Sequence, residues 1–156
     1  MLENLRQTVI SVVSNVFETM FFLTLELQEE GWAEGMSSLT PSSTFFRGEI
    51  GFHGRQSGRL RLYLPSELAK AMATNFLGLE EGTATESQTQ DMVSELCNVI
   101  CGNLLSQLDR KTVWDLSLPR TLPISSSEIK KEDEGSGITL RFNTEGDEVR
   151  VNIQIE

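Results

Sequence analysis

The chain of 156 residues has a hydrophobic content of 38% and a charged content of 23%, which suits one soluble globular domain over residues 1–156. A formal net charge of −10 argues against binding to nucleic acid or to an anionic membrane surface, because both attract lysine and arginine. The most apolar stretch, residues 20–25, is far shorter than the roughly 20 residues of a membrane span, and the N-terminus has no signal-peptide pattern. We therefore expect a cytoplasmic protein.

The N-terminal segment predicts an amphipathic helix followed by a loop. Apolar residues recur at helical spacing over residues 2–22, so this helix is expected to pack against a sheet or another helix. Residues 26–43 are rich in serine and polar side chains and contain Gly31, Gly35 and Pro41, which indicates a loop.

A β-hairpin and a short helix come next. Residues 44–53 and 59–64 predict two antiparallel strands, because apolar and polar side chains alternate along the second of them. Ser66 is a suitable N-cap for a helix over residues 67–77, and Gly78 is expected to end that helix.

Residues 86–110 predict a long helix with two different faces. At about 100° per residue, its apolar side chains fall on one broad side. They are Met92, Val93, Leu96, Cys97, Ile100, Leu104 and Leu108. On the opposite side, within roughly 60° of one another, lie Asp91, Glu95, Asn98 and Gly102, which we call the acidic–amide stripe. A solvated face would carry lysine and arginine among its acids. It would also rarely include glycine, which costs about 1 kcal/mol relative to alanine, so the stripe indicates a docking site.

The rest of the chain predicts mainly β structure. Residues 112–117 predict a strand, and Pro119 and Pro123 limit the segment after it to an edge strand or an extended connection. Residues 130–137 indicate a charged loop, whereas residues 138–155 alternate in polarity and predict a hairpin. Together the elements predict an α+β fold, in which long helices pack on one face of an antiparallel sheet.

The cysteines, the histidine and the tryptophans are interpreted as structural residues. Cys97 and Cys101 are one helical turn apart, where a disulfide would be poorly oriented. The single histidine, His53, leaves too few ligands for a metal site. We therefore expect buried, reduced thiols and no bound metal. Trp32 and Trp114 are expected in the core or at its rim.

Alone, the acidic–amide stripe lacks the parts of an active site. The sequence near it offers no histidine, no nucleophile with a base and no glycine-rich phosphate loop. A carboxylate can pair with a cation, however, and a carboxamide can both donate to a water and accept from it. Glutamine side chains of GTPases position a hydrolytic water in this way. Glu95 and Asn98 are therefore suited to completing an active site that lies mostly on another protein.

The spacing Asp91-x-x-x-Glu95-x-x-Asn98 resembles the Asp/Ser-x-x-x-Glu-x-x-Asn signature of the CheC/CheX/FliY chemotaxis phosphatases. Residues 49–63 and the helix predicted after them resemble the hairpin and helix that precede this signature in CheX. The resemblance covers about residues 45–125 and is greatest to CheX.

This resemblance implies a CheC-like fold and an enzyme that hydrolyses the aspartyl-phosphate of the response regulator CheY. It implies that Asn98 enters the active site of the regulator and orients the attacking water, while Glu95 pairs with the conserved lysine of the regulator. Asp91 would be a secondary contact or support for the helix. Gly102, by our own interpretation, leaves room for the partner. Mg²⁺ belongs to the regulator, so this chain is expected to bind no cofactor.

The resemblance leaves several alternatives open. The first helix carries Asn15 and Glu18 in reversed order, and one signature per chain suits CheX, whose chains pair through an extended sheet. We therefore expect a homodimer through an exposed edge, either residues 112–117 or the terminal hairpin. Pro119 and Pro123 are both candidates for the proline that family members carry after the asparagine. Two alternatives to an enzyme are a non-catalytic CheX-like module that binds receiver domains and an adaptor that scaffolds a signalling assembly.

Overall fold

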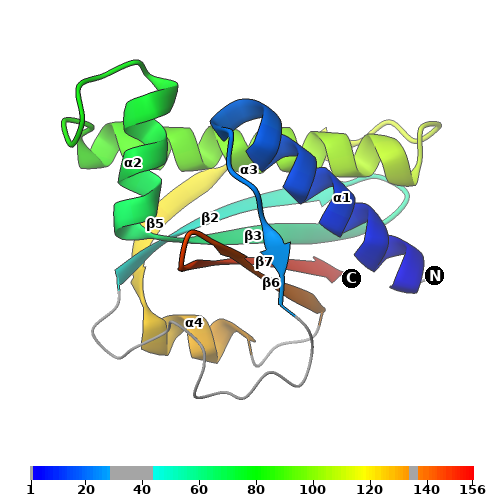
Figure 1. The fold of residues 1–156 in the computed structure, drawn as a ribbon. Helices are drawn as coiled ribbons and strands as arrows, with labels where there is room; N and C mark the ends of the chain where they lie inside the picture. Colours follow the sequence, from blue (N-terminus) through cyan, green and yellow to red (C-terminus); the bar gives the residue numbers. More distant parts are fainter. Residues whose placement is uncertain (1, 29–43, 134–136) are drawn as a thin grey trace.

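The fold is a β-sheet with helices on both of its faces, as Figure 1 shows for a computed structural model that describes residues 2–28, 44–133 and 137–156. Over these residues the sheet has seven antiparallel strands in the order β1-β6-β7-β3-β2, and both β4 and β5 pair with the far edge of β2. The strands are β1 (Glu26–Leu27), β2 (Thr44–His53), β3 (Ser57–Pro65), β4 (Asp115–Leu116), β5 (Arg120–Ser125), β6 (Ile138–Thr144) and β7 (Asp147–Ile155).

Three long or medium helices cover one face of the sheet, and a short helix lies on the other. The first three are α1 (Leu2–Phe21), α2 (Ser66–Phe76) and α3 (Glu86–Leu108), and the fourth is α4 (Ser126–Asp133) (Figure 1). The predicted α+β fold is therefore confirmed. Within the described ranges, none of these helices has the length and apolar character needed to cross a lipid bilayer.

The hydrophobic core lies between the sheet and the three helices that share one face. Leucines at alternate positions of β3 are completely buried there, because successive residues of a strand point to opposite faces. The main buried side chains of this core are Val9, Val13, Phe17, Ile50, Leu60, Leu62, Leu64, Val93, Leu96, Ile100, Leu140, Phe142 and Val151. The core thus holds α3 firmly along its apolar side.

Both predicted hairpins are present. The first is longer than expected, because pairing extends to His53 opposite Ser57. The second turns at Glu145 and Gly146, which both have positive φ values of 51° and 88°. This is the conformation that a two-residue hairpin turn requires, and the Oδ1 atom of Asn143 accepts a hydrogen bond from the Gly146 N–H group at 3.1 Å.

The start of α2 differs by one residue from the prediction. Ser66 is not the N-cap but the first helical residue, because Pro65 is the last extended residue, with a ψ of 139°. No side chain caps this end. The other end is as predicted: Gly78 has a φ of 67°, and it donates from its N–H group to the carbonyl oxygen of Asn75 at 3.2 Å. Leu79 donates to Thr74 at 2.9 Å, which completes a Schellman motif.

Three segments correct the sequence interpretation. The expected loop over 26–43 begins with the short strand β1, and the part from residue 29, with Trp32, lies outside the described residues. The strand expected over 112–117 is reduced to β4, and β5 is the edge strand that tolerates Pro123. The first part of the charged loop expected over 130–137 is instead the end of α4, and residues 134–136 lie outside the described residues. This helix forms because Ile129 is completely buried against Phe45, Tyr63 and Ile124 on the far face of the sheet, a tertiary contact that outweighs the polar composition.

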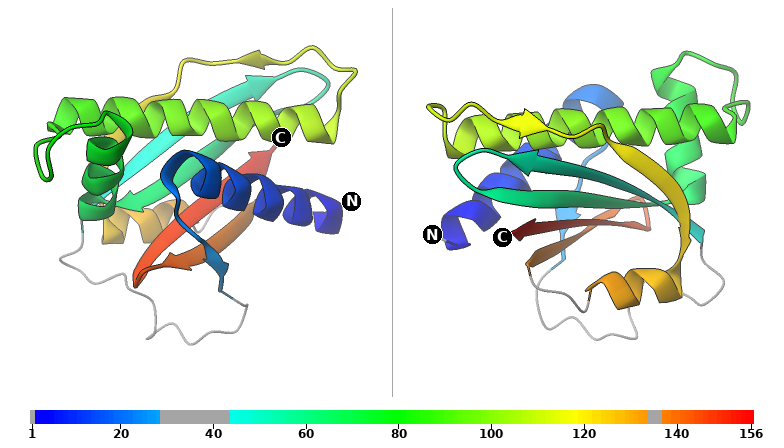
Figure 2. Two further views of the ribbon diagram at one scale, coloured as in Figure 1. Left: turned by 45° about the horizontal axis from the view of Figure 1, so that its top comes forward. Right: turned by 180° about the vertical axis from the view of Figure 1, so that it is seen from behind.

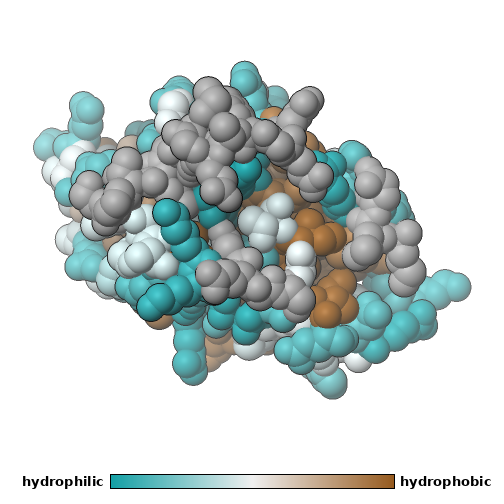
Figure 3. All heavy atoms as spheres, turned by 90° about the horizontal axis from the view of Figure 1, so that it is seen from below, coloured by the Kyte–Doolittle hydropathy of each residue, from teal (hydrophilic) through white to brown (hydrophobic). Residues whose placement is uncertain are grey.

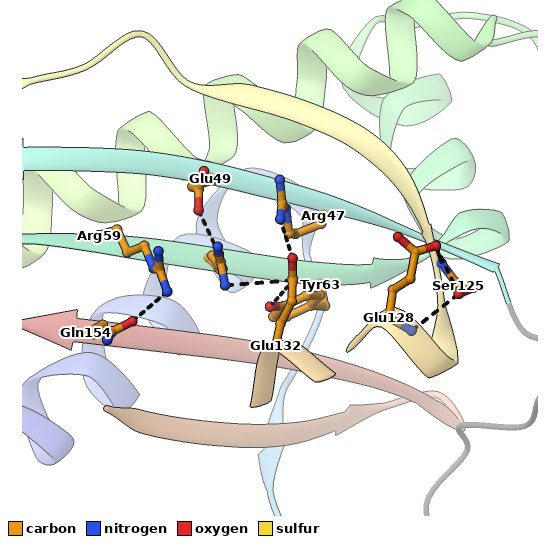
Figure 4. A network of polar contacts seen from close by, with 9 residues as sticks. Arg47, Glu49, Arg59, Tyr63, Ser125, Glu128, Glu132 and Gln154 are labelled. Atoms are coloured by element: carbon orange, nitrogen blue, oxygen red, sulfur yellow. Dashed lines mark hydrogen bonds and ion pairs between the residues drawn. The ribbon is translucent and has the colours of Figure 1, made fainter. Parts of the chain in front are cut away.

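Polar contacts complete the attachment of α4. Glu132 accepts a hydrogen bond from the Tyr63 hydroxyl at 2.7 Å and forms an ion pair with Arg47 (Figure 4). Arg61 donates to Glu49 at 2.6 Å and lies 3.9 Å from Glu132. The described surface on this side of the molecule is predominantly hydrophilic, around a smaller apolar area (Figure 3).

Candidate functional site

The acidic–amide stripe is carried by α3, whose start is defined by a local signal. The Thr85 hydroxyl accepts a hydrogen bond from the Gln88 N–H group at 3.1 Å, and the Gln88 side chain accepts one from the Thr85 N–H group at 2.9 Å. This reciprocal capping box satisfies backbone donors that the first turn of a helix leaves unpaired. The helix therefore begins at Glu86, as the sequence predicts.

Close packing against β2 fixes the position of α3. A Cβ atom at Gly48 would overlap the Sγ atom of Cys97 and lie 3.0 Å from Cγ1 of Val93. Only a residue without a side chain allows the helix to approach the strand so closely. Cys97 directly precedes Asn98, so this contact sets the height of the stripe above the sheet.

The stripe itself faces away from the core. Asp91 and Glu95 are exposed, and Asn98 and Gly102 are partly buried. The side chains of Asp91, Glu95 and Asn98 form no hydrogen bond or ion pair with any residue in the described ranges. The four predicted site residues therefore lie together on one accessible helix face, and their polar groups are available to a partner.

Gly102 leaves an open space at the end of the stripe. A Cβ atom built on this glycine would meet no atom within 4 Å in the described part of the chain. No internal packing therefore requires a glycine there, unlike at Gly48, where a side chain would collide with α3. Because packing within the chain does not explain the glycine, the close approach of another molecule is the better explanation for it.

Different elements border the two sides of α3 (Figure 2). Helices α1 and α2 pack on one side, and the connection from α3 to β5 runs along the other side. On that second side, the hydroxyl groups of Ser94 and Thr121 lie 2.7 Å apart and share a hydrogen bond. Sequence reasoning did not identify this border, because it depends on how β5 pairs with β2.

The other residues considered from the sequence have structural surroundings. Cys97 and Cys101 are buried and not disulfide-bonded. Burial raises the pKa of both thiols, that of Cys101 to about 12, so neither is a reactive thiolate at neutral pH. His53 lies at the exposed end of β2 and contacts the Ser57 hydroxyl. Trp114 is a rim residue, since it is partly buried and packs edge-on against Phe52 with ring centroids 5.9 Å apart.

Within the described ranges, the stripe is neither a metal site nor part of a cleft. No cluster of at least three histidine, cysteine or acidic residues there could hold a metal ion. An apolar cleft of about 700 Å³, which sequence reasoning missed, lies between the start of α1 and the end of α3 and is lined by Leu5, Phe52, Leu104 and Ile155 among others. None of the stripe residues lines it. The candidate site is therefore an exposed helix surface rather than a pocket.

Comparisons with known proteins agree with this fold. Residues 46–143 match the family model described as chemotaxis phosphatase CheX. The crystal structure of the chemotaxis protein CheX from Vibrio vulnificus is similar to the chain at 21% identity with a TM-score of 0.74, covering 97% of this chain and 96% of that one. No curated protein sequence matches the chain.

Two further solved structures share the fold. A chain of the CheX-CheY-BeF3-Mg²⁺ complex from Borrelia burgdorferi is 20% identical with a TM-score of 0.71, and the match covers 96% of each chain. A CheC-like superfamily protein from Shewanella sp. PV-4 is 20% identical with a TM-score of 0.68, and the match covers 100% of this chain and 99% of that one.

Proposed function

Because the chain belongs to the CheX family of chemotaxis phosphatases, we propose that it accelerates hydrolysis of the aspartyl-phosphate of a CheY-type response regulator. The observation that carries this proposal is the accessible pair Glu95 and Asn98, which stands on a rigid helix with no internal partner in the described ranges. A relative with the same fold is known in complex with CheY, BeF3 and Mg²⁺, which supports a receiver domain as the partner of this chain.

In the proposed reaction, Asn98 acts on the attacking water. Its carboxamide oxygen accepts a hydrogen bond from the water and its NH₂ group donates one, so the side chain can hold the water in line with the phosphorus atom. The water oxygen forms a new bond to phosphorus, the bond between phosphorus and the aspartyl oxygen breaks, and inorganic phosphate and a free carboxylate result. Positioning of this kind requires a rigid helix, and the close packing of Cys97 on Gly48 holds this helix in place.

Glu95 is proposed to secure the docking. It lies three residues before Asn98, so both side chains project from the same side of the helix. A carboxylate is the natural partner of a lysine ammonium group, and the pair would be partly shielded from water once the partner covers it. Asp91 adds a second negative charge one turn earlier, and Gly102 leaves space one turn after Asn98. Mg²⁺ would be held by the regulator, so none of these residues is proposed as its ligand.

We also propose a homodimer formed through a sheet edge. Within the described residues, β1 pairs with Phe142 and Asn143, and the Gln28 N–H group donates to the Arg141 carbonyl oxygen, which leaves residues 138–140 at the start of β6 without a partner strand on that side. An open strand edge readily pairs with another chain. The other edge is less suitable, because β4 has only two residues and Pro123 in β5 lacks an N–H group. Measurement of the molar mass by light scattering would test this proposal, and a monomer at micromolar concentration would contradict it.

The phosphatase assignment is tested by phosphate release from phosphorylated CheY-type regulators. The variant Asn98→Ala is expected to lose about 10²-fold or more of the rate acceleration, a typical loss when one group aligned with the transition state is removed. Asn103→Ala is the matched control, because Asn103 is an exposed asparagine on the same helix but outside the stripe.

The rates of phosphate release with Asn98→Ala and Asn103→Ala test the proposed mechanism. If Asn98→Ala retains the full acceleration, or if both variants lose activity equally, the proposed mechanism is wrong. If the wild-type chain binds regulators but accelerates hydrolysis of none of them, the chain is a binding module instead.

A further inference from the structure

An apolar side chain lies exposed beside the acidic–amide stripe. Leu118, in the connection between β4 and β5, has 86% of its surface accessible. Val113, in the connection between α3 and β4, is exposed to the same extent. Single exposed apolar residues are common on protein surfaces, so exposure alone assigns them no role. Their positions relative to Asn98, however, are very different.

The pairing of β5 with β2 locates Leu118. Thr121 pairs with Gly48 and contacts Ser94 of α3, whereas Ser117 pairs with Gly51 through a hydrogen bond of 2.9 Å. Farther along, the indole N–H group of Trp114 donates to the Asp109 carbonyl oxygen at the end of α3. The connection therefore runs antiparallel to α3.

Leu118 consequently lies at the level of the stripe. Three residues of extended chain separate it from Thr121, which corresponds to about 10 Å. Along α3, Asn98 and Gly102 lie one and two turns beyond Ser94, which corresponds to about 6 Å and 12 Å. Leu118 is therefore beside the interval between Asn98 and Gly102.

Val113 is much farther from the stripe. It adjoins Thr112, whose hydroxyl donates to the Asp109 carboxylate at 2.6 Å, beyond the end of α3. The eleven residues from Asn98 to Asp109 span about 16 Å along the helix axis. A specific interface of about 800 Å² on each partner has a radius of about 16 Å, so a partner centred on Asn98 covers Leu118 and reaches Val113 at most with its rim.

We propose that Leu118 is an apolar docking contact for the response regulator that covers Glu95 and Asn98. This inference rests on the proposed function, because it takes the regulator as the occupant of the stripe. The stripe supplies carboxylates and an amide, and exposed charge pairs add little affinity by themselves. An apolar contact that becomes buried next to them supplies the affinity that such polar groups lack, and it excludes water from the reacting centre.

The test compares Leu118→Ser with Val113→Ser, which removes an equally exposed apolar side chain outside the proposed contact. We expect the first variant to raise both the KM for the phosphorylated regulator and the Kd for the beryllofluoride-activated regulator by about tenfold or more, with kcat unchanged. The second variant is expected to match the wild type. Both side chains are so exposed that neither change disturbs the core.

Two results would overturn this inference. One is an equal Kd for Leu118→Ser and Val113→Ser. The other is a change in molar mass with Leu118→Ser, which would show that a second copy of the chain occupies this surface. The variant Asn98→Ala separates this inference from the proposed function. Unchanged turnover in Asn98→Ala removes the phosphatase mechanism, whereas the Kd of Leu118→Ser still decides on the docking contact.

Discussion

Replacement of Gly102 by alanine separates the stability of the protein from its activity. Glycine in the interior of a helix is less favourable than alanine by about 1 kcal/mol, because the unfolded chain has more conformations to lose. Gly102 lies well inside α3, and a Cβ atom there would meet nothing within 4 Å in the described part of the chain. The full gain is therefore expected, without any steric penalty.

We expect Gly102→Ala to raise the free energy of unfolding by about 1 kcal/mol, which for a chain of this size corresponds to a rise of about 2–4 °C in Tm. Calorimetry and urea unfolding would measure both quantities. A lower Tm for Gly102→Ala would refute the reasoning, because it would show that the space around the glycine is not open.

A larger side chain at the same position tests the role of that space in docking. Gly102→Leu is expected to raise the KM for the phosphorylated regulator roughly tenfold, since an overlap at a packed interface costs about 1–3 kcal/mol. Asn103→Leu is the control, because the neighbouring side chain points about 100° away around the helix. If both variants have the KM of the wild type, the glycine is not kept open for a partner.

Three further predictions concern the stability of the fold. Gly48→Ala should destabilise the fold by about 1–3 kcal/mol. Adding Cys97→Ala to the same chain should recover part of this loss, because it removes the overlapping sulfur. Strictly additive effects in a double-mutant cycle would contradict the contact. Although burial raises the pKa of Glu49, the hydrogen bond and charge of Arg61 lower it more, so the net pKa is lowered. This pair therefore stabilises the protein fully above the pKa of an unfolded glutamate, about 4.3, and the stabilisation is lost as the pH falls below that value. In an acid unfolding titration, Glu49→Gln should lose less stability than the wild type over this range. Burial raises the pKa of Cys101 to about 12, so stability should fall as the pH rises above about 8.5, where an unfolded thiol ionises, and Cys101→Ala should reduce that fall in alkaline unfolding experiments.

The sequence was most informative where structure is determined locally. The stripe follows from helical periodicity alone, and the start of α3 depends on a contact between Thr85 and Gln88, three residues apart. The helix α4 was missed because its formation depends on one buried apolar residue, Ile129, and on partners far away in the chain. The position of Leu118 was equally out of reach, because it follows from the register between β5 and β2 and not from any pattern in its own segment.

The contact between Gly48 and Cys97 has a consequence for how such a protein could be redirected to a new target. It anchors the catalytic asparagine proposed here through the interior of the molecule, whereas Leu118, the proposed docking contact, is exposed and supports nothing beneath it. The apolar part of the recognition surface therefore lies outside the helix that holds Asn98, so substitutions at Leu118 can change the choice of partner without altering the position of the catalytic side chain.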